Sequence, residues 1–143
     1  MENLKVIGQT KDAGFQIGVR KTFPVSVNQA WDFLFDNDGL LIWLDGVKFD
    51  DLVLHQAYKT KEGIEGKINT LKPYSHIRLT WKRKNWSNTS AVQVRVLNSK
   101  DKATISFHQD KLLDQNQREE MKAYWSKVIE EIDTKLKAVA STP

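Results

Sequence analysis

Alternation of apolar and polar residues dominates the chain from Val47 to Asp110. This period of two is typical of strands with one buried face. It predicts six strands, at Val47–Phe49, Leu52–Tyr58, Ile64–Leu71, His76–Arg83, Ala91–Asn98 and Ala103–Asp110. An earlier strand is predicted at Phe15–Phe23, ended by Pro24, which has no N–H to donate. One apolar and one polar face indicate an antiparallel sheet that is covered on one side only.

Two short helices are predicted between the first strand and the others. Ser26 and Gln29 have the spacing of a capping box, at the start of a helix over Val27–Phe35. A second helix is predicted at Leu40–Leu44, after the polar stretch that begins at Asp36. Ala30, Trp31 and Leu34 share one side of the first of these helices, and Trp43 of the second is expected to point inward.

A helical period replaces the alternation near the C-terminus, where a helix is predicted over Gln115–Ala138. Asp114 and Gln117 have the spacing of a second capping box. The apolar stripe consists of Met121, Trp125, Val128, Ile132, Leu136 and Val139. At 1.5 Å per residue the helix is about 35 Å long, so we expect it to cover the whole apolar face of the sheet.

Short motifs accompany this order of elements: Pro24-x-Ser26-x-x-x-Ala30-Trp31, Trp43, Gly66, Ile77-Arg78-Leu79-Thr80-Trp81, Thr104-Ile105-Ser106-Phe107-His108 and Tyr124-Trp125. In their order and spacing, the chain from Phe15 to Leu136 resembles the START-like (SRPBCC, birch-pollen-allergen-like) superfamily. More narrowly, it resembles the family named for the C-terminal domain of the activator of heat-shock-protein-90 ATPase, homologue 1-like.

The resemblance implies an α+β helix-grip fold, in which a curved antiparallel sheet wraps around a long C-terminal helix. Family members often have glycine before the tryptophan of the last helix, where this chain has Tyr124. We therefore expect a narrower cavity mouth than is usual in the family.

Composition narrows the picture further. The 143 residues contain no cysteine, which excludes disulfides, thiolate nucleophiles and cysteine-ligated metal centres. With 40% hydrophobic and 28% charged residues, the chain is expected to fold as one domain over 1–143, with a core at about 15–138. No apolar run approaches about 18 residues, so neither a membrane span nor a leader is expected, and we predict a cytoplasmic location.

The charge of the chain does not point to a particular class of binding partner. The net charge of +4 is mild, and its densest run is Lys82-Arg83-Lys84, two residues before Trp86. Basic residues beside an aromatic ring suit single-stranded nucleic acid. A solvated hairpin tip explains the same run more simply, so we predict no nucleic-acid partner.

Catalytic signals are weak. The histidines His55, His76 and His108 lack the spacing of metal ligands, and no nucleophile or phosphate-binding motif is present. Glu62, Glu65 and Arg78 would become acid–base candidates only if the assignment of sheet faces were shifted by one residue. We predict no cofactor, no metal and no intrinsic catalysis.

A sheet curved around a helix leaves a space between them, and such pockets are mostly apolar, with volumes of about 300–1,000 Å³. The candidate lining residues are Trp43, Phe49, Ile68, Leu79, Trp81, Val94, Phe107, Tyr124, Trp125 and Val128. Simple filling of the core explains each of these residues equally well. The resemblance favours a cavity, and we predict that it holds a small hydrophobic or amphipathic ligand.

Two other functions stay open. The family name implies a regulator that stimulates the ATPase of a heat-shock chaperone, with the chaperone as partner. The third possibility is an enzyme of the cyclase or hydrolase type.

Overall fold

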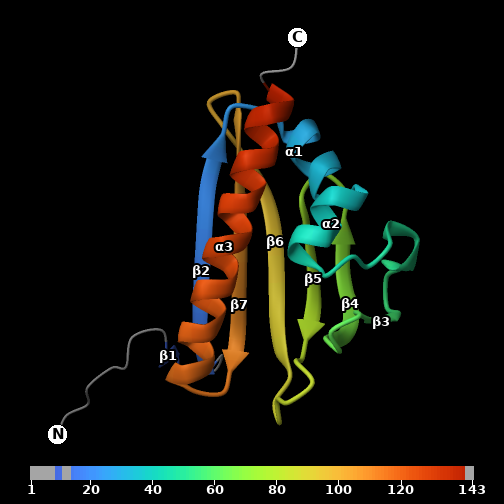
Figure 1. The fold of residues 1–143 in the computed structure, drawn as a ribbon, viewed down its shortest axis with the longest axis vertical. Coiled ribbons are helices and arrows are strands. Elements are labelled where there is room, and N and C mark those ends of the chain that lie inside the picture. Colours follow the sequence, from blue (N-terminus) through green and yellow to red (C-terminus); the bar gives the residue numbers. More distant parts are fainter. Residues whose placement is uncertain (1–8, 11–13, 141–143) are drawn as a thin grey trace, which may run out of the picture.

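A curved antiparallel sheet forms the frame of the molecule (Figure 1). The computed structural model describes residues 9–10 and 14–140. Its strands are β1 (Gln9–Thr10), β2 (Gly14–Phe23), β3 (Ala57–Lys59), β4 (Glu65–Lys72), β5 (His76–Trp81), β6 (Ser90–Ser99) and β7 (Lys102–Leu112). They are arranged in the order β1-β2-β7-β6-β5-β4-β3. The long strands β6 and β7 lie in the middle of the sheet.

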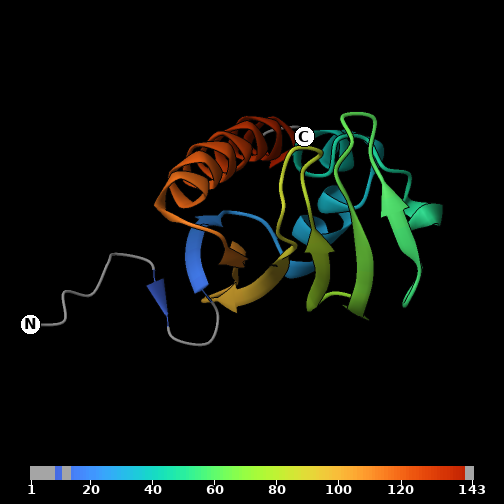
Figure 2. The same ribbon diagram turned by 90° about the horizontal axis from the view of Figure 1, so that it is seen from below.

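The helices α1 (Val27–Leu34), α2 (Asn37–Trp43) and α3 (Gln115–Ala140) lie on one side of this sheet (Figure 2). A single 3-10 turn, η1 (Phe49–Asp51), lies at the β3 edge of the sheet. The helix α3 runs along β2 and β7, while α1 and α2 cover the face beside it (Figure 1). The expectation that α3 alone covers the whole face is therefore wrong, because the curved sheet is wider than one helix. None of the described helices is both long enough and apolar enough to cross a membrane.

The predicted sheet faces are confirmed. In β5, Ile77, Leu79 and Trp81 are fully buried, while the alternate residues are half-buried on the outer face. Glu65 is exposed, and Arg78 lies 3.3 Å from Asp110 on the outer face. The shift by one residue that would turn these side chains inward is not observed.

The segment between α2 and β4 differs most from the prediction. The strand predicted at Val47–Phe49 is absent, and the one predicted at Leu52–Tyr58 is reduced to β3. His55 has a φ of +69°, which breaks the extended backbone. The segment nevertheless lies against β4, since the N–H of His55 donates to Ile68 O at 2.7 Å. Burial does not follow the period of two here, because Leu52 and Tyr58 are buried while all residues between them are exposed.

The helix starts are set by side-chain caps. The Ser26–Gln29 box of α1 is complete, with hydrogen bonds of 2.9 and 3.1 Å. The helix α2 begins earlier than predicted because the Asp36 carboxylate accepts from Gly39 N at 2.8 Å. At α3, Asp114 caps Gln117 N at 2.8 Å, but the Gln117 side chain accepts from Leu113 N. The second predicted box is thus only half formed.

Candidate ligand-binding site between the sheet and α3

Five aromatic rings fill the space between the sheet and the N-terminal half of α3. We call them the aromatic cluster: Trp43 of α2, Trp81 of β5, Phe107 of β7, and Tyr124 and Trp125 of α3. Phe107 stacks on Trp125 with ring centroids 4.8 Å apart, and Trp81 lies 5.4 Å from Trp125. Tyr124 meets both tryptophans nearly edge-on, at 5.7 and 4.8 Å. These geometries are favourable aromatic contacts.

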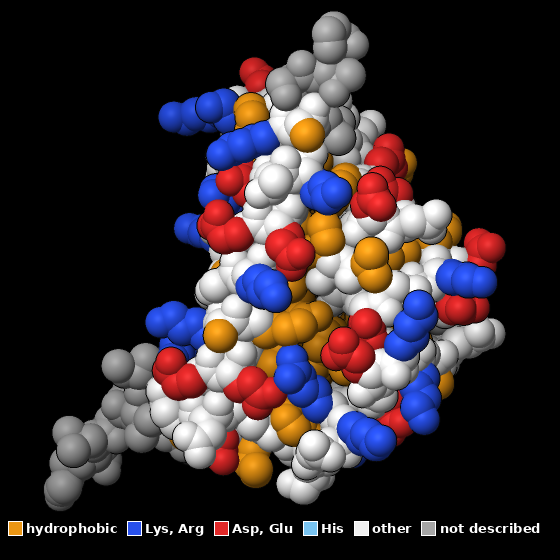
Figure 3. All heavy atoms as spheres, in the orientation of Figure 1, with side chains coloured by type: hydrophobic (Ala, Val, Ile, Leu, Met, Phe, Trp, Pro, Cys, Tyr) orange, Lys and Arg blue, Asp and Glu red, His pale blue; other side chains and the backbone are white. Residues whose placement is uncertain are grey.

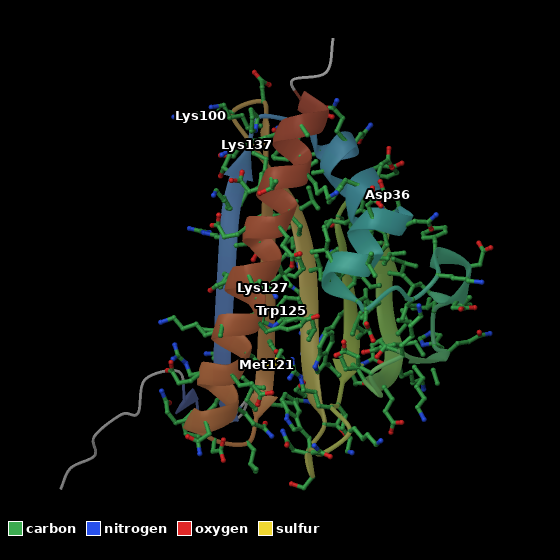
Figure 4. The ribbon with its side chains drawn as sticks, viewed as in Figure 1. Asp36, Lys100, Met121, Trp125, Lys127 and Lys137 are labelled. Carbon is green, nitrogen blue, oxygen red and sulfur yellow. The ribbon has the colours of Figure 1, made fainter. Side chains whose placement is uncertain are left out.

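A buried chain of hydrogen bonds fixes Trp125, which reaches from α3 towards the sheet (Figure 4). Its indole N–H donates to Gln109 Oε1, and Gln109 Nε2 donates to Ser90 Oγ, both at 2.8 Å. Ser90 in turn donates to the carbonyl of Trp81 at 2.7 Å. Buried polar groups are costly unless paired, so this chain gives Trp125 one preferred orientation.

Trp81 lacks such a partner. Its side chain is fully buried, and Nε1 has no hydrogen-bond acceptor among the residues that the structure describes. By contrast, Trp43 Nε1 donates to Leu34 O at 2.8 Å. A buried N–H without an acceptor costs about 1–3 kcal/mol, so the cluster contains one unsatisfied donor beside Tyr124.

Tyr124 forms the outer edge of the cluster and is only half-buried. Its hydroxyl donates to Trp43 O at 3.2 Å, which links α3 to α2. Burial raises its pKa to about 12, and the nearby Arg83 cation opposes this shift. The ring is therefore a neutral phenol throughout the physiological range.

Arg83 covers Tyr124 from the loop between β5 and β6. Its guanidinium carbon lies 5.2 Å from the Tyr124 ring centroid, a cation–π geometry. Its Nη1 donates to Glu120 on α3 at 2.6 Å, while its Nε is buried without an acceptor in the described part of the chain. Arg83 and Glu120 thus join the β5–β6 loop to α3 across the edge of the cluster.

A pocket of about 500 Å³ lies outside this ion pair, which we call the mouth pocket. It is lined by Glu62, Ile64, Arg83, Lys84, Asn85, Trp86, Asp114, Asn116, Gln117 and Glu120. Figure 3 shows apolar surface beside the N-terminal half of α3, with charged side chains gathered around it. Because Arg83 both lines the pocket and covers Tyr124, it separates the pocket from the aromatic cluster.

A second pocket, of about 360 Å³, lies between α2 and the C-terminal half of α3. It contains Leu41, Ile42 and Thr134 together with charged residues of both helices. Along α3, Tyr124 therefore lies between the residues that line the mouth pocket and those that line this second pocket.

The structure brings most of the predicted site residues together. Eight are at most 2% exposed, namely Trp43, Ile68, Leu79, Trp81, Val94, Phe107, Trp125 and Val128. Tyr124 lies at their edge. Phe49 is 54% exposed on η1, where it packs 6.2 Å from the Phe35 ring, so it lies away from the group.

Four polar residues of this site were not predicted: Ser90, Gln109, Arg83 and Glu120. For two of them the signal was present, because Gln109 shares the apolar face with Ile105 and Phe107, and Ser90 shares that of Val92. A polar residue in an apolar row indicates a buried hydrogen bond. Arg83 and Glu120 carry no such signal, since 37 residues separate them along the chain.

The histidines lie away from the aromatic cluster. His76 is on the outer face of β5, where burial and the positive charges of Arg95 and Lys72 lower its pKa. His108 contacts Gln16 at 3.0 Å, and His55 is exposed. Among the described residues, no group of three or more His, Asp or Glu side chains is placed to hold a metal ion.

Comparisons with known proteins agree with this architecture. The sequence model of a family described as Activator of Hsp90 ATPase homolog 1-like protein matches residues 24–137. No curated protein is significantly similar to the chain.

Solved structures share the fold at low sequence identity. CalU16 from Micromonospora echinospora is 17% identical, with a TM-score of 0.70 over 85% of this chain and 76% of that one. A protein from Mesorhizobium loti is 12% identical, with a TM-score of 0.72 over 86% and 97%. An HSP90 activator from Plasmodium falciparum is 17% identical, with a TM-score of 0.71 over 87% and 97%. At these identities the likeness concerns the fold alone.

Proposed function

The chain belongs to the Activator of Hsp90 ATPase homolog 1-like family, and we propose that it binds a small amphipathic molecule between its sheet and α3. The fold of this family is a ligand-binding scaffold. The observation that carries the proposal is the position of Tyr124, which is half-buried at the outer edge of the aromatic cluster, next to Arg83 of the mouth pocket. The apolar part of the ligand would take the place of the Tyr124 ring against Trp81 and Trp125.

The free energy lost when Tyr124 is displaced is smaller than the gain from burying the alkyl tail of a ligand. The ring is held by one neutral hydrogen bond of 3.2 Å, one cation–π contact and edge-on contacts with Trp81 and Trp125. Together these contribute about 3–4 kcal/mol. Burying an alkyl tail of about nine carbons gains roughly 7 kcal/mol at about 0.8 kcal/mol per CH₂ group. The remaining balance of about 3–4 kcal/mol corresponds to millimolar binding, which ordering costs weaken further.

Intrinsic tryptophan fluorescence and melting temperature test this proposal. We expect titration with decanoate or decan-1-ol to change the fluorescence saturably, because Trp81 and Trp125 line the site. The melting temperature should rise with ligand concentration. If neither probe changes the fluorescence or the melting temperature, the proposal is wrong.

A Tyr124→Ala variant sharpens this test. Removing the ring should tighten binding of the longer homologue dodecanoate several-fold, because the mouth widens. Tyr74→Ala is the matched control, since Tyr74 lies on the β4–β5 turn and contacts Asp32 and Trp31. An equal change in both variants would argue against Tyr124 as the barrier.

A second candidate function is regulation of a chaperone. It is supported by the family name, by the shared fold of the Plasmodium falciparum HSP90 activator, and by apolar side chains exposed on α2 and after it. These are Leu41, Phe49, Val53 and Leu54, which are 40–62% exposed.

The ATPase rate of an Hsp90 chaperone, measured with and without added protein, tests this second function. A rate increase that is lost in Leu41→Asp and kept in Lys100→Asp would support it. An unchanged ATPase rate at a saturating concentration of the protein would exclude this second function. Lys100 suits as the control because it lies on the turn between β6 and β7, distant along the chain from α2.

A further inference from the structure

We propose that the ligand carries a carboxylate, and that Arg83 binds this group by exchanging Glu120 for it. This inference rests on the proposed function and adds the chemical class of the ligand. The apolar tail would lie against the aromatic cluster, with the carboxylate at its edge.

Two unsatisfied donors point to an acceptor on the ligand. Trp81 Nε1 and Arg83 Nε are both buried without an acceptor among the described residues. Both side chains flank the same ring, since Tyr124 lies 5.7 Å from Trp81 and 5.2 Å from the Arg83 guanidinium carbon. Neither group can accept a hydrogen bond, so an ammonium or another donor-only head group would leave them unpaired. An oxygen acceptor would satisfy them.

The charge of Arg83 favours an ionised acceptor. A guanidinium offers five N–H donors in a planar fork that matches a carboxylate. In the structure its ion-pair partner is Glu120, whose side chain is 43% exposed. An exposed carboxylate loses little free energy when it returns to water, because surface ion pairs contribute little to stability. A ligand carboxylate can therefore replace Glu120 at low cost.

Direct contact, and not the overall field, would give this selectivity. The mouth pocket contains the carboxylates of Glu62, Asp114 and Glu120 against the cations Arg83 and Lys84. Asp114 is already engaged as the cap of α3, and Glu120 is paired with Arg83. These five charges sum to −1, so the pocket as a whole does not attract an anion, and we expect no fall in the affinity of an anionic ligand as salt is added.

Decanoate and decan-1-ol form a matched pair of probes, because they share the tail and differ in the head group. At neutral pH we expect decanoate to bind the unmodified protein about tenfold more tightly, as expected for one charge-assisted hydrogen bond. Arg83→Gln should remove this preference by weakening decanoate binding about tenfold while leaving decan-1-ol within twofold.

Two further variants test whether the effect is specific to Arg83 and whether Glu120 competes with the ligand carboxylate. Lys82→Gln is the control, because Lys82 precedes Arg83 in the chain, does not line the mouth pocket and should leave both affinities unchanged. Glu120→Gln removes the competing carboxylate and should strengthen decanoate binding several-fold. Circular dichroism and the melting temperature of each variant report whether it is folded.

The outcomes distinguish this inference from the proposed function. If neither probe binds, the proposed function fails. If both probes bind the unmodified protein equally, the site exists but does not select a carboxylate, and the inference is overturned; this comparison requires no variant. It is overturned as well if folded Arg83→Gln retains the preference for decanoate.

Discussion

At the scale of single residues, close packing decides which positions tolerate change. Gly66 in β4 passes the backbone of β5 so closely that a Cβ there would lie 1.9 Å from Thr80 O. Gly18 in β2 has more room, since the nearest atom to its Cβ would be His108 Cδ2 at 3.6 Å. A side chain therefore fits at Gly18 but not at Gly66, although both glycines lie in strands.

We predict that Gly66→Ala lowers the free energy of unfolding by about 2–3 kcal/mol, since the backbone atoms must shift. Gly18→Ala should change it by no more than about 0.5 kcal/mol, because a methyl group fits there. Urea unfolding of both variants measures the difference. Equal stability of Gly66→Ala and the unmodified chain would contradict the observed approach of the strands.

At the scale of elements, α3 and the central strands are joined by the hydrogen-bond chain through Gln109. The chain crosses from Trp125 on α3 to β7 and β6, and ends on the Trp81 carbonyl of β5. It runs beside the aromatic cluster, so it adds directional contacts that fix α3 relative to the sheet.

Gln109→Ala should lower the free energy of unfolding by about 2–4 kcal/mol, because Trp125 Nε1 loses its acceptor and a small cavity forms. Gln93→Ala is the matched control, since Gln93 is half-buried on the outer face of β6. Its loss should cost less than about 1 kcal/mol. Urea unfolding followed by tryptophan fluorescence compares the two variants. A similar loss of unfolding free energy in both would show that the buried hydrogen bonds of Gln109 stabilise the fold no more than an outer-face side chain does.

At the scale of the whole molecule, an ion-pair network holds the C-terminal half of α3 to the edge of the sheet. Asp133 on α3 lies 3.1 Å from Lys21 on β2 and 3.0 Å from Lys137 one turn further on. The hydrogen bond from Lys137, and then that from Lys21, lower the pKa of Asp133 below its ordinary value of 3.8, although burial opposes them. This carboxylate is therefore more stable in its charged form in the folded protein than in the unfolded chain.

The sign of the pH dependence follows from linkage. A lowered pKa stabilises the fold above the ordinary value of 3.8, and this contribution is lost as the pH falls through the lowered pKa. We predict that Asp133→Asn is less stable than the unmodified chain at pH 7, and that the difference shrinks as the pH falls below 3.8.

Urea unfolding at a series of pH values measures this difference. Glu130→Gln is the control, because Glu130 lies 3.5 Å from Lys21 with a side chain that is 68% exposed. Its effect should be small at every pH. A difference between Asp133→Asn and the unmodified chain that does not change with pH would exclude the ion pair as its cause.

Periodicity in the chain was enough to predict the central strands, the two helical regions and the buried rows such as Ile77, Leu79 and Trp81. This is because the side chains of a strand or helix point to a given face by local geometry alone. The same reasoning located eight of the ten predicted site residues in the interior and a ninth, Tyr124, at its edge.

The folded arrangement settled what local geometry leaves open. The segment around Phe49 became a 3-10 turn that is closed by local hydrogen bonds from Asp51 N to Lys48 O and from Leu52 N to Phe49 O, and only the later residues His55 and Gln56 pair with β4. Arg83 met Tyr124 and Glu120 only because a loop and a helix, far apart in the chain, are brought together by the curvature of the sheet. Contacts of this kind depend on the relative positions of whole elements, which no pattern within one element encodes.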